Sequence, residues 1–476
     1  MGTAGEPFQP WRAPVLVMAM LASACTSPVA VDDPLATLAQ PGEGPRRLLG
    51  AMVALDHHPG DERYLDALTR LLWIPGYTVM SRRHAFDRLL EYDEARLKKT
   101  IRRRMPSMSA RLWQEQLCGL IVEHGWTDLS PALVSAWARV IPYVDDFTRV
   151  EYDSLVEIYG SREGVVDAVF ELLVESRSST LRTRCWGLLY RLGYHQRLVA
   201  LLEAHSVDPD DAMLIDLRAA VLDLGVVPRN REEILWVRKL HDPSRAEFWS
   251  QATAAVRSLP HARRMELELR DLPIVVAASI HDPELLRADK QALYDRLAAT
   301  LAGRRKHIDS RRYEGFPGSY DQYLAAHRKV LTWGDLAAMI LALRAVDVPQ
   351  VAEHLRAYAE DDRQDKTTEY GGVIRLDAQG RFEVIEFRPK YRTADNRFVA
   401  SQAMLDAAYT AVFHFHFHAQ KYNNRRYAAP GIGDLNYAEN LRANCLVFSF
   451  VNRDTMNMDY YRHTRVIVDL GEVSRH

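Results

Sequence analysis

Cysteine is rare in this chain, and so are long hydrophobic runs and any excess of charge of one sign. Only four cysteines occur among 476 residues, and Cys118, Cys185 and Cys445 lie in largely apolar sequence, so no disulfide framework is predicted. No run of roughly 20 apolar residues follows position 30, so no membrane-spanning helix is expected there. Lys and Arg total 61 against 63 for Asp and Glu, and this balance gives no long-range field that would favour a nucleic-acid partner.

What the chain does have is length. Domains usually hold roughly 100 to 200 residues, so 476 residues predict two or more folding units. The composition, with 47% hydrophobic and 26% charged residues, is typical of globular protein.

The first 24 residues resemble a bacterial lipoprotein signal peptide. Arg12 precedes an apolar run at 15–21, and small residues at 22–24 lead into Cys25. The resemblance implies that Cys25 is lipidated and becomes the first mature residue, which would anchor the protein to the membrane on the periplasmic side of the cell envelope. An ordinary cleaved signal or an apolar tail is the alternative.

A long helical segment is predicted after this leader. Residues 25–45 lack an apolar period and are interpreted as a tether. From 46 to 300 one amphipathic pattern follows another, as at Leu65, Leu68 and Leu72. Helices of about 10 to 16 residues joined by short turns predict an all-α, solenoid-like array that resembles HEAT repeats. An irregular helical bundle is the alternative.

The pattern changes again beyond a basic connector at 301–332. Helices are predicted at 334–345 and 349–360, and strands at 372–376 and 382–387, where the apolar period falls from about 3.6 to 2. We therefore expect a C-terminal α/β domain over residues 333–476.

Three histidines alternate with three phenylalanines at 413–418. On a strand, alternate side chains point to opposite faces, so His414, His416 and His418 share one face and the phenylalanines the other. Three imidazoles on one buried face would each need a hydrogen-bond partner, so a bound metal is predicted in preference to structural histidines.

Two carboxylates accompany the histidines. Asp434 lies in the segment Gly431–Leu435, interpreted as a tight glycine loop, and Glu369 directly precedes a predicted strand. Two imidazoles and one carboxylate leave a coordination position open, and a further carboxylate can move a proton, which together suit metal-assisted hydrolysis.

These residues resemble the JAMM (JAB/MPN-type) metalloprotease family. The family pattern is an early Glu before a strand, followed much later by H-x-H-P-x7-S-x2-D, and it is matched by Glu369, by His416-x-His418 and by Asp434. The resemblance covers about 333–476 and implies an MPN-like α/β fold. It also implies Zn²⁺ held by His416, His418 and Asp434, with Glu369 as the catalytic base.

The chain departs from the family pattern at two residues and in one spacing. Ala419 replaces the Pro, the loop before Asp434 is about four residues longer, and Gly431 replaces the Ser that helps to stabilise the oxyanion in the family. The absence of the Ser hydroxyl at Gly431 is expected to affect the rate of hydrolysis more than the binding of the metal. Among the histidines, His414 is either an alternative ligand, paired with His416, or a residue that supports the ligands or faces the substrate without binding the metal.

Two functions follow from these observations. The first is an exported, membrane-tethered zinc peptidase or isopeptidase, in which the helical array presents a protein or peptide substrate or binds a protein partner. The alternative is a non-catalytic scaffold or binding protein that retains a metal-binding domain.

Overall fold

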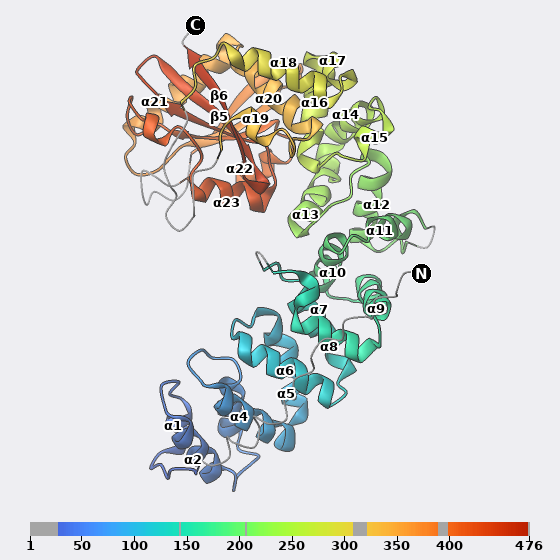
Figure 1. Ribbon diagram of the computed structural model, residues 1–476, viewed down its shortest axis with the longest axis vertical. Coiled ribbons are helices and arrows are strands. Elements are labelled where there is room, and N and C mark those ends of the chain that lie inside the picture. Colours follow the sequence, from blue (N-terminus) through green and yellow to red (C-terminus); the bar gives the residue numbers. More distant parts are fainter. Residues whose placement is uncertain (1–26, 142–143, 205–206, 308–320, 389–397, 475–476) are drawn as a thin grey trace, which may run out of the picture. The chain divides into compact units, whose positions relative to one another are not determined.

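The computed structural model describes residues 27–141, 144–204, 207–307, 321–388 and 398–474. The predicted signal peptide, 1–24, and the predicted lipidation site, Cys25, lie outside this part. Contacts divide the chain into two compact units, Met1–Leu188 and Leu189–His476. The described residues of the first unit form helices, and the second unit combines helices with a sheet (Figure 1). The prediction of a helical region followed by an α/β region is therefore confirmed.

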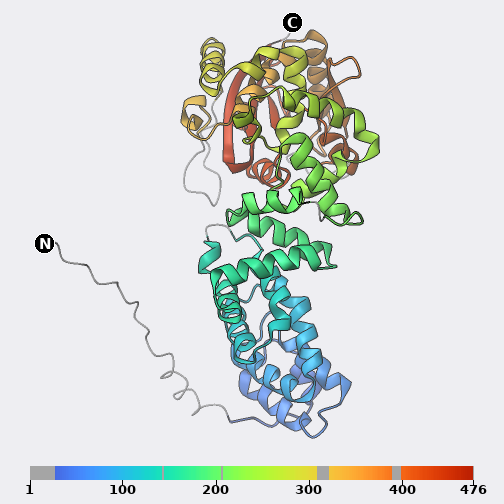
Figure 2. The ribbon, with the colours of Figure 1, turned by 90° about the vertical axis from the view of Figure 1, so that its right-hand side faces the viewer.

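Helices of the first unit contact others close to them in the chain, so that they stack along the chain (Figures 1 and 2). Their bounds are α1 Pro34–Leu38, α2 Pro45–Leu55, α3 Glu62–Leu71, α4 Val79–Tyr92, α5 Glu94–Arg104, α6 Arg111–Glu123, α7 Ser130–Trp137, α8 Val150–Tyr159 and α9 Arg162–Glu175. The helix α4, for example, contacts α2, α3, α5 and α6. The helix α10, Ser179–Arg191, crosses the boundary between the units.

The amphipathic pattern explains these helices. In α3 the carboxylate of Asp61 accepts a hydrogen bond of 2.8 Å from the N–H of Arg63, which caps the first turn. Leu65, Leu68 and Leu71 then fall on one face and are buried. The helix is therefore held by its apolar face against its neighbours.

The structure differs from the sequence prediction in the tether, 25–45. Pro34 begins α1, and Asp33 caps it by accepting from the N–H of Ala36 at 3.0 Å. Leu38 at the end of this helix is buried, and its carbonyl accepts a hydrogen bond of 2.6 Å from the Tyr77 hydroxyl. An Asp cap followed by Pro is a helix start signal, but five residues are too few to show an apolar period.

The second unit places helices around one sheet. Its helices are α11 His195–Glu203, α12 Ala212–Leu224, α13 Arg231–Leu240, α14 Ala246–Arg257, α15 His261–Arg264, α16 Leu272–His281, α17 Pro283–Arg287, α18 Lys290–Ala302, α19 Leu324–His327, α20 Trp333–Val346, α21 Pro349–Gln364, α22 Gln402–Ala408 and α23 Ile432–Leu441. Its strands are β1 Gly371–Leu376, β2 Phe382–Phe387, β3 Phe413–His418, β4 Cys445–Phe450, β5 Thr455–Arg462 and β6 Val466–Ser474. Within the described ranges, no helix is both long enough and apolar enough to cross a membrane.

The sheet has the order β2-β1-β3-β4-β5-β6, in which β3 and β4 are parallel and the other neighbours antiparallel. The histidine strand β3 is therefore central. Its neighbour β1 begins with two glycines, because there is no room for a side chain at either position. A Cβ at Gly371 would lie 2.6 Å from the carbonyl oxygen of Phe415, and a Cβ at Gly372 would lie 2.2 Å from the carbonyl oxygen of Ile385. The close approach keeps β1, and the Glu369 that precedes it, beside the histidines.

The core of the second unit is continuous across the predicted domain start at 333. Buried residues from Ala220 to Val473 form one hydrophobic cluster. The helix α20 is buried along almost its whole length and contacts α16, α18 and β6. Trp236 of α13 donates a hydrogen bond of 2.9 Å to the Tyr409 carbonyl. Helices earlier than 333 therefore share the core of the sheet.

The predicted connector, 301–332, is described only at its two ends. Near its start, the side chain of Arg304 donates to the Glu472 carbonyl at 2.8 Å, and the N–H of His307 donates to the Asp469 carboxylate at 2.6 Å. This end of the segment is therefore bound to β6.

Candidate metal centre

The strand β3 separates its two kinds of side chain as predicted. Phe413, Phe415 and Phe417 are buried in the hydrophobic core, and the Phe415 and Phe417 rings contact Tyr358 of α21 edge to face. The histidines lie on the other face and are also buried. A buried imidazole needs a polar partner, so the contacts of each histidine decide its role.

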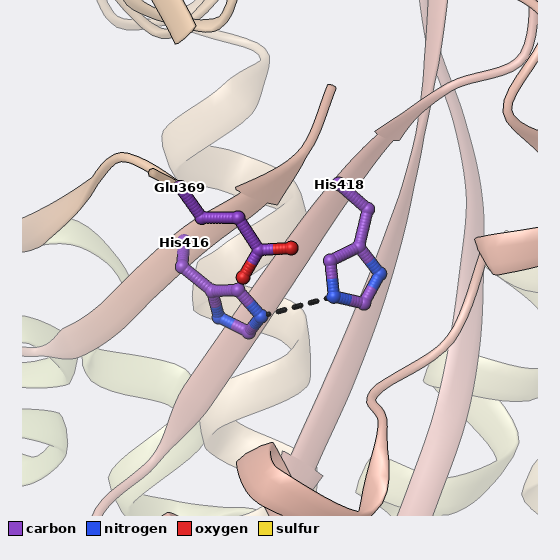
Figure 3. A group of neighbouring side chains, drawn as sticks. All are labelled: Glu369, His416 and His418. Atoms are coloured by element: carbon purple, nitrogen blue, oxygen red, sulfur yellow. Dashed lines mark hydrogen bonds between the residues drawn. The ribbon is translucent and has the colours of Figure 1, made fainter. Parts of the chain in front are cut away.

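His416 and His418 converge with Glu369 (Figure 3). The two Nε2 atoms are 3.3 Å apart, and one ligand atom from each of the three residues lies within 4.8 Å of the others. All three side chains are buried, with residue exposures of 3 to 8%. Two nitrogen donors and an oxygen donor in this arrangement could hold a metal ion.

Asp434 faces the same two nitrogens. One carboxylate oxygen lies 3.3 Å from Nε2 of His416 and the other 3.5 Å from Nε2 of His418. The segment around it is not the predicted glycine loop. Gly431 is the N-cap of α23 and Asp434 stands in the first turn, where its carboxylate accepts a hydrogen bond of 2.6 Å from the Gly431 N–H. The first turn of a helix favours a carboxylate because its amide groups are unsatisfied.

The second nitrogen of each of these two histidines has a partner of its own. Nδ1 of His418 donates to the Tyr427 carbonyl at 2.7 Å, which leaves Nε2 directed at the site. Nδ1 of His416 lies 3.4 Å from the Tyr461 hydroxyl, and the Phe398 ring stacks on the imidazole. Both rings are therefore held in one orientation.

Glu369 is held by two residues that the sequence analysis missed. Gln420 donates a hydrogen bond of 2.9 Å to its carboxylate. The side chain of Asn424 donates at 2.7 Å to Gln420 and at 2.8 Å to the His418 carbonyl. Nothing in the sequence around Gln420 and Asn424 signals this role, except that both follow the histidine strand closely.

His414 is not brought into this group. Its Nδ1 lies 2.9 Å from the Tyr437 hydroxyl of α23, and its Nε2 lies 3.4 Å from the Ala408 carbonyl. Burial lowers the pKa of His414 to about 4, so the ring is neutral at physiological pH. The geometry therefore favours His416 with His418 over the alternative pair.

The charges of the centre depend on one another. Burial raises the pKa of Glu369. Burial alone would lower the pKa of His418, but the nearby Asp434 and Glu369 carboxylates raise it to about 9. The pKa of Asp434 is held below its usual range because the two imidazoles outweigh the effect of burial. The protein alone therefore stabilises a positive charge at this point, which a proton or a metal cation can supply.

A cavity of about 1210 Å³ opens beside these groups. Glu369, His416, His418 and Asp434 form part of its wall, and residues of the helices α22 and α23 also line it. Its remaining lining is mainly apolar and amide side chains, among them Phe398, Met404, Leu405, Asn436 and Asn440. The candidate metal ligands therefore face an open cavity.

Comparisons of this chain with protein-family models, with curated proteins and with solved structures gave no match. Function must therefore be inferred from the chemistry of the site.

Proposed function

We propose that the protein is a zinc-dependent hydrolase of peptide or isopeptide bonds, with a JAMM-type centre on an MPN-like domain and a HEAT-like helical array. The observation that carries the proposal is that His416, His418 and Glu369 form a buried group at the wall of a cavity, and that the partly buried Asp434 faces both imidazoles. Imidazole nitrogen and carboxylate oxygen are usual zinc ligands, and three such ligands leave a position open in a catalytic site.

His416, His418 and Asp434 would hold the ion. A bound zinc ion would supply Lewis acidity, which polarises a substrate carbonyl and acidifies water. Glu369 would accept the proton of the attacking water and pass it to the leaving amine. Its raised pKa brings proton acceptance and release nearer to neutral pH, and Gln420 keeps its carboxylate in place.

Glu369 could instead be a ligand, because its carboxylate lies within reach of both imidazoles. Asp434 is the better ligand, since it offers a separate oxygen to each imidazole nitrogen and is fixed by the Gly431 N–H. Glu369 is tied to Gln420, outside the proposed ligand set. We therefore assign the proton transfer to Glu369.

The substitution Glu369→Gln tests this assignment. The amide keeps the shape of the side chain but cannot accept a proton, so hydrolysis of a peptide and isopeptide library should fall by about 100-fold or more while zinc content stays unchanged. Glu353→Gln, at an exposed position of α21, is the matched control and should change neither. If Glu369→Gln loses zinc, Glu369 is a ligand. If wild type and variant both bind zinc and both are inactive, the scaffold is favoured.

The scaffold has one observation in its favour. Gly431 offers no hydroxyl where the family pattern has the oxyanion-stabilising Ser. A scaffold, however, needs no proton carrier, and Glu369 is buried at the centre and held there by Gln420. A neutral amide donor compensates a buried carboxylate only in part, and a raised pKa in a cavity wall is typical of a group that transfers protons, so this residue favours the enzyme.

We also propose that the protein is exported and anchored to the bacterial membrane through a lipid on Cys25, and that the helical array binds a protein substrate or partner. The anchor rests on the lipobox-like sequence before Cys25. Wild type should partition with the membrane fraction and Cys25→Ser should be released from it. A fully soluble wild type after export would contradict the anchor.

A further inference from the structure

The helix that carries Asp434 is fixed at both of its ends. At the first turn of α23, Asp434 faces the two imidazoles. At the other end, Arg442 reaches two carboxylates of earlier helical segments: Glu233 of α13 and Glu268, which directly precedes the 3-10 helix η7, Leu269–Asp271. The elements α13 and α23 lie side by side (Figure 1).

Arg442 stands in an unusual backbone conformation for a residue with a side chain. It is the C-cap of α23, with φ 52° and ψ 36°, and its N–H donates to the Ala438 carbonyl at 2.9 Å. Glycine is the usual residue in this left-handed position, because a Cβ is disfavoured there. Arg442 adopts this disfavoured conformation while its side chain reaches Glu233 and Glu268.

The contacts of the Arg442 side chain are buried. Its Nε pairs with Glu233, and its Nη2 lies 3.4 Å from Glu268 and 3.0 Å from Nε2 of His463. The side chain of Arg442 is 12% exposed, and those of Glu233 and Glu268 are 2% and 6% exposed. Since buried charges are costly to separate, this end of the helix is held firmly.

A helix of ten residues is about 15 Å long and moves as a rod. Between its ends, the Tyr437 hydroxyl meets Nδ1 of His414 on β3. A shift of the end at Arg442 would therefore be transmitted along α23 to Asp434, which lies only 3.3 and 3.5 Å from the imidazoles.

We propose that Arg442 is a positioning residue of the metal centre. By binding Glu233 and Glu268, it sets α23 at the height and angle that bring Asp434 to His416 and His418. The helical segments before the sheet thereby determine the affinity of the centre for its metal. The inference assumes the metal site of the proposed function, and it does not assume that the protein catalyses hydrolysis.

The substitution Arg442→Gly is the sharpest test, because glycine suits the left-handed cap and removes only the side chain. In the full-length protein, we expect its zinc affinity, measured by chelator competition, to fall by about tenfold or more. We also expect the visible absorption spectrum of the Co²⁺-substituted protein to change, since it reports the coordination geometry. Arg442→Lys, which keeps the charge, should restore most of the affinity.

The control is Arg229→Ala. Arg229 also pairs with Glu268 but lies before α13 and not on α23. This variant should destabilise the same buried network and leave the zinc affinity and the Co²⁺ spectrum unchanged. If Arg442→Gly does not fold, Glu233→Gln removes the charge of the main partner and should lower the affinity in the same direction.

Two results would overturn the proposal: zinc affinity in folded Arg442→Gly within about twofold of wild type, or an equal loss in Arg229→Ala. If wild type binds no zinc, the proposed function fails, and hydrogen exchange in the metal-free protein decides the role of Arg442. The hydrogen-bonded amides beyond the first turn of α23 should then exchange faster in Arg442→Gly and not in Arg229→Ala. Equal exchange in both would contradict the role.

Discussion

At the scale of single residues, the candidate metal centre is built from groups whose orientation is set by other side chains and by the backbone. His418 donates to the Tyr427 carbonyl, Gln420 donates to Glu369, and Asp434 accepts from the Gly431 N–H. Such outer contacts fix the ring and carboxylate orientations on which metal affinity depends. They also separate the roles of the two acids, because Asp434 is turned towards the imidazoles and Glu369 is tied beside them.

Gly431 allows a direct test of the oxyanion role that the family resemblance implies. A Cβ at this position would lie 3.5 Å from the Asp434 carboxylate, an ordinary contact, and φ of −80° suits any residue. Gly431→Ser should therefore keep zinc and raise the rate of hydrolysis by about tenfold or more. Gly431→Ala adds the Cβ without the hydroxyl and should not raise the rate. A gain in thermal stability without a gain in rate would show that the hydroxyl caps α23 instead.

At the scale of elements, the 3-10 helix η9, His463–Arg465, packs against α23 and adds a pH-dependent term to stability. Burial, which outweighs the opposing effect of Glu268 and is aided by Arg270 and Arg442, lowers the pKa of His463 to about 4. The unfolded chain, with a pKa near 6.5, binds the proton first as pH falls. The contribution of the neutral His463 to the free energy of unfolding is thus complete above about pH 6.5. It is lost as pH falls towards 4, which lowers the free energy of unfolding by up to roughly 3 kcal/mol.

The measurement is urea unfolding of wild type and His463→Gln at pH 7.5 and 4.5. Glutamine stays neutral throughout, so the difference between the two pH values should be smaller in the variant than in wild type. An equal difference in the two proteins would contradict a buried, neutral His463.

The elements also show how far the sequence could predict the structure. The alternation at 413–418 predicted β3 to the residue, because a period of two has one structural meaning. The helix α23 was missed, since Gly431-Ile432-Gly433 suggests a turn and only the Asp434 contacts reveal a helix start. The strand β4, Cys445–Phe450, is a short apolar run, which does not distinguish strand from helix. The contacts of Gln420 and Asn424 depend on a loop that folds back on β3, and no local pattern predicts that.

At the scale of the whole molecule, the second unit contains both the candidate metal centre and the helices from Leu189 onward. The continuous core from Ala220 to Val473 and the ion pairs of Arg442 with Glu233 and Glu268 join these parts. Sequence patterns could separate helical from α/β segments, but they could not show that one core spans both, because the contacts join residues about 200 positions apart. Experiments on the centre therefore require the full chain.

The zinc content of the purified full-length protein tests the central claim most directly. We predict close to one zinc ion per chain in wild type, and sharply lower occupancy when His416, His418 or Asp434 is replaced by Ala. His414→Ala should lower the occupancy less, because both of its ring nitrogens face other partners. A wild type without zinc, or equal loss at His414 with retention at His418, would contradict the account.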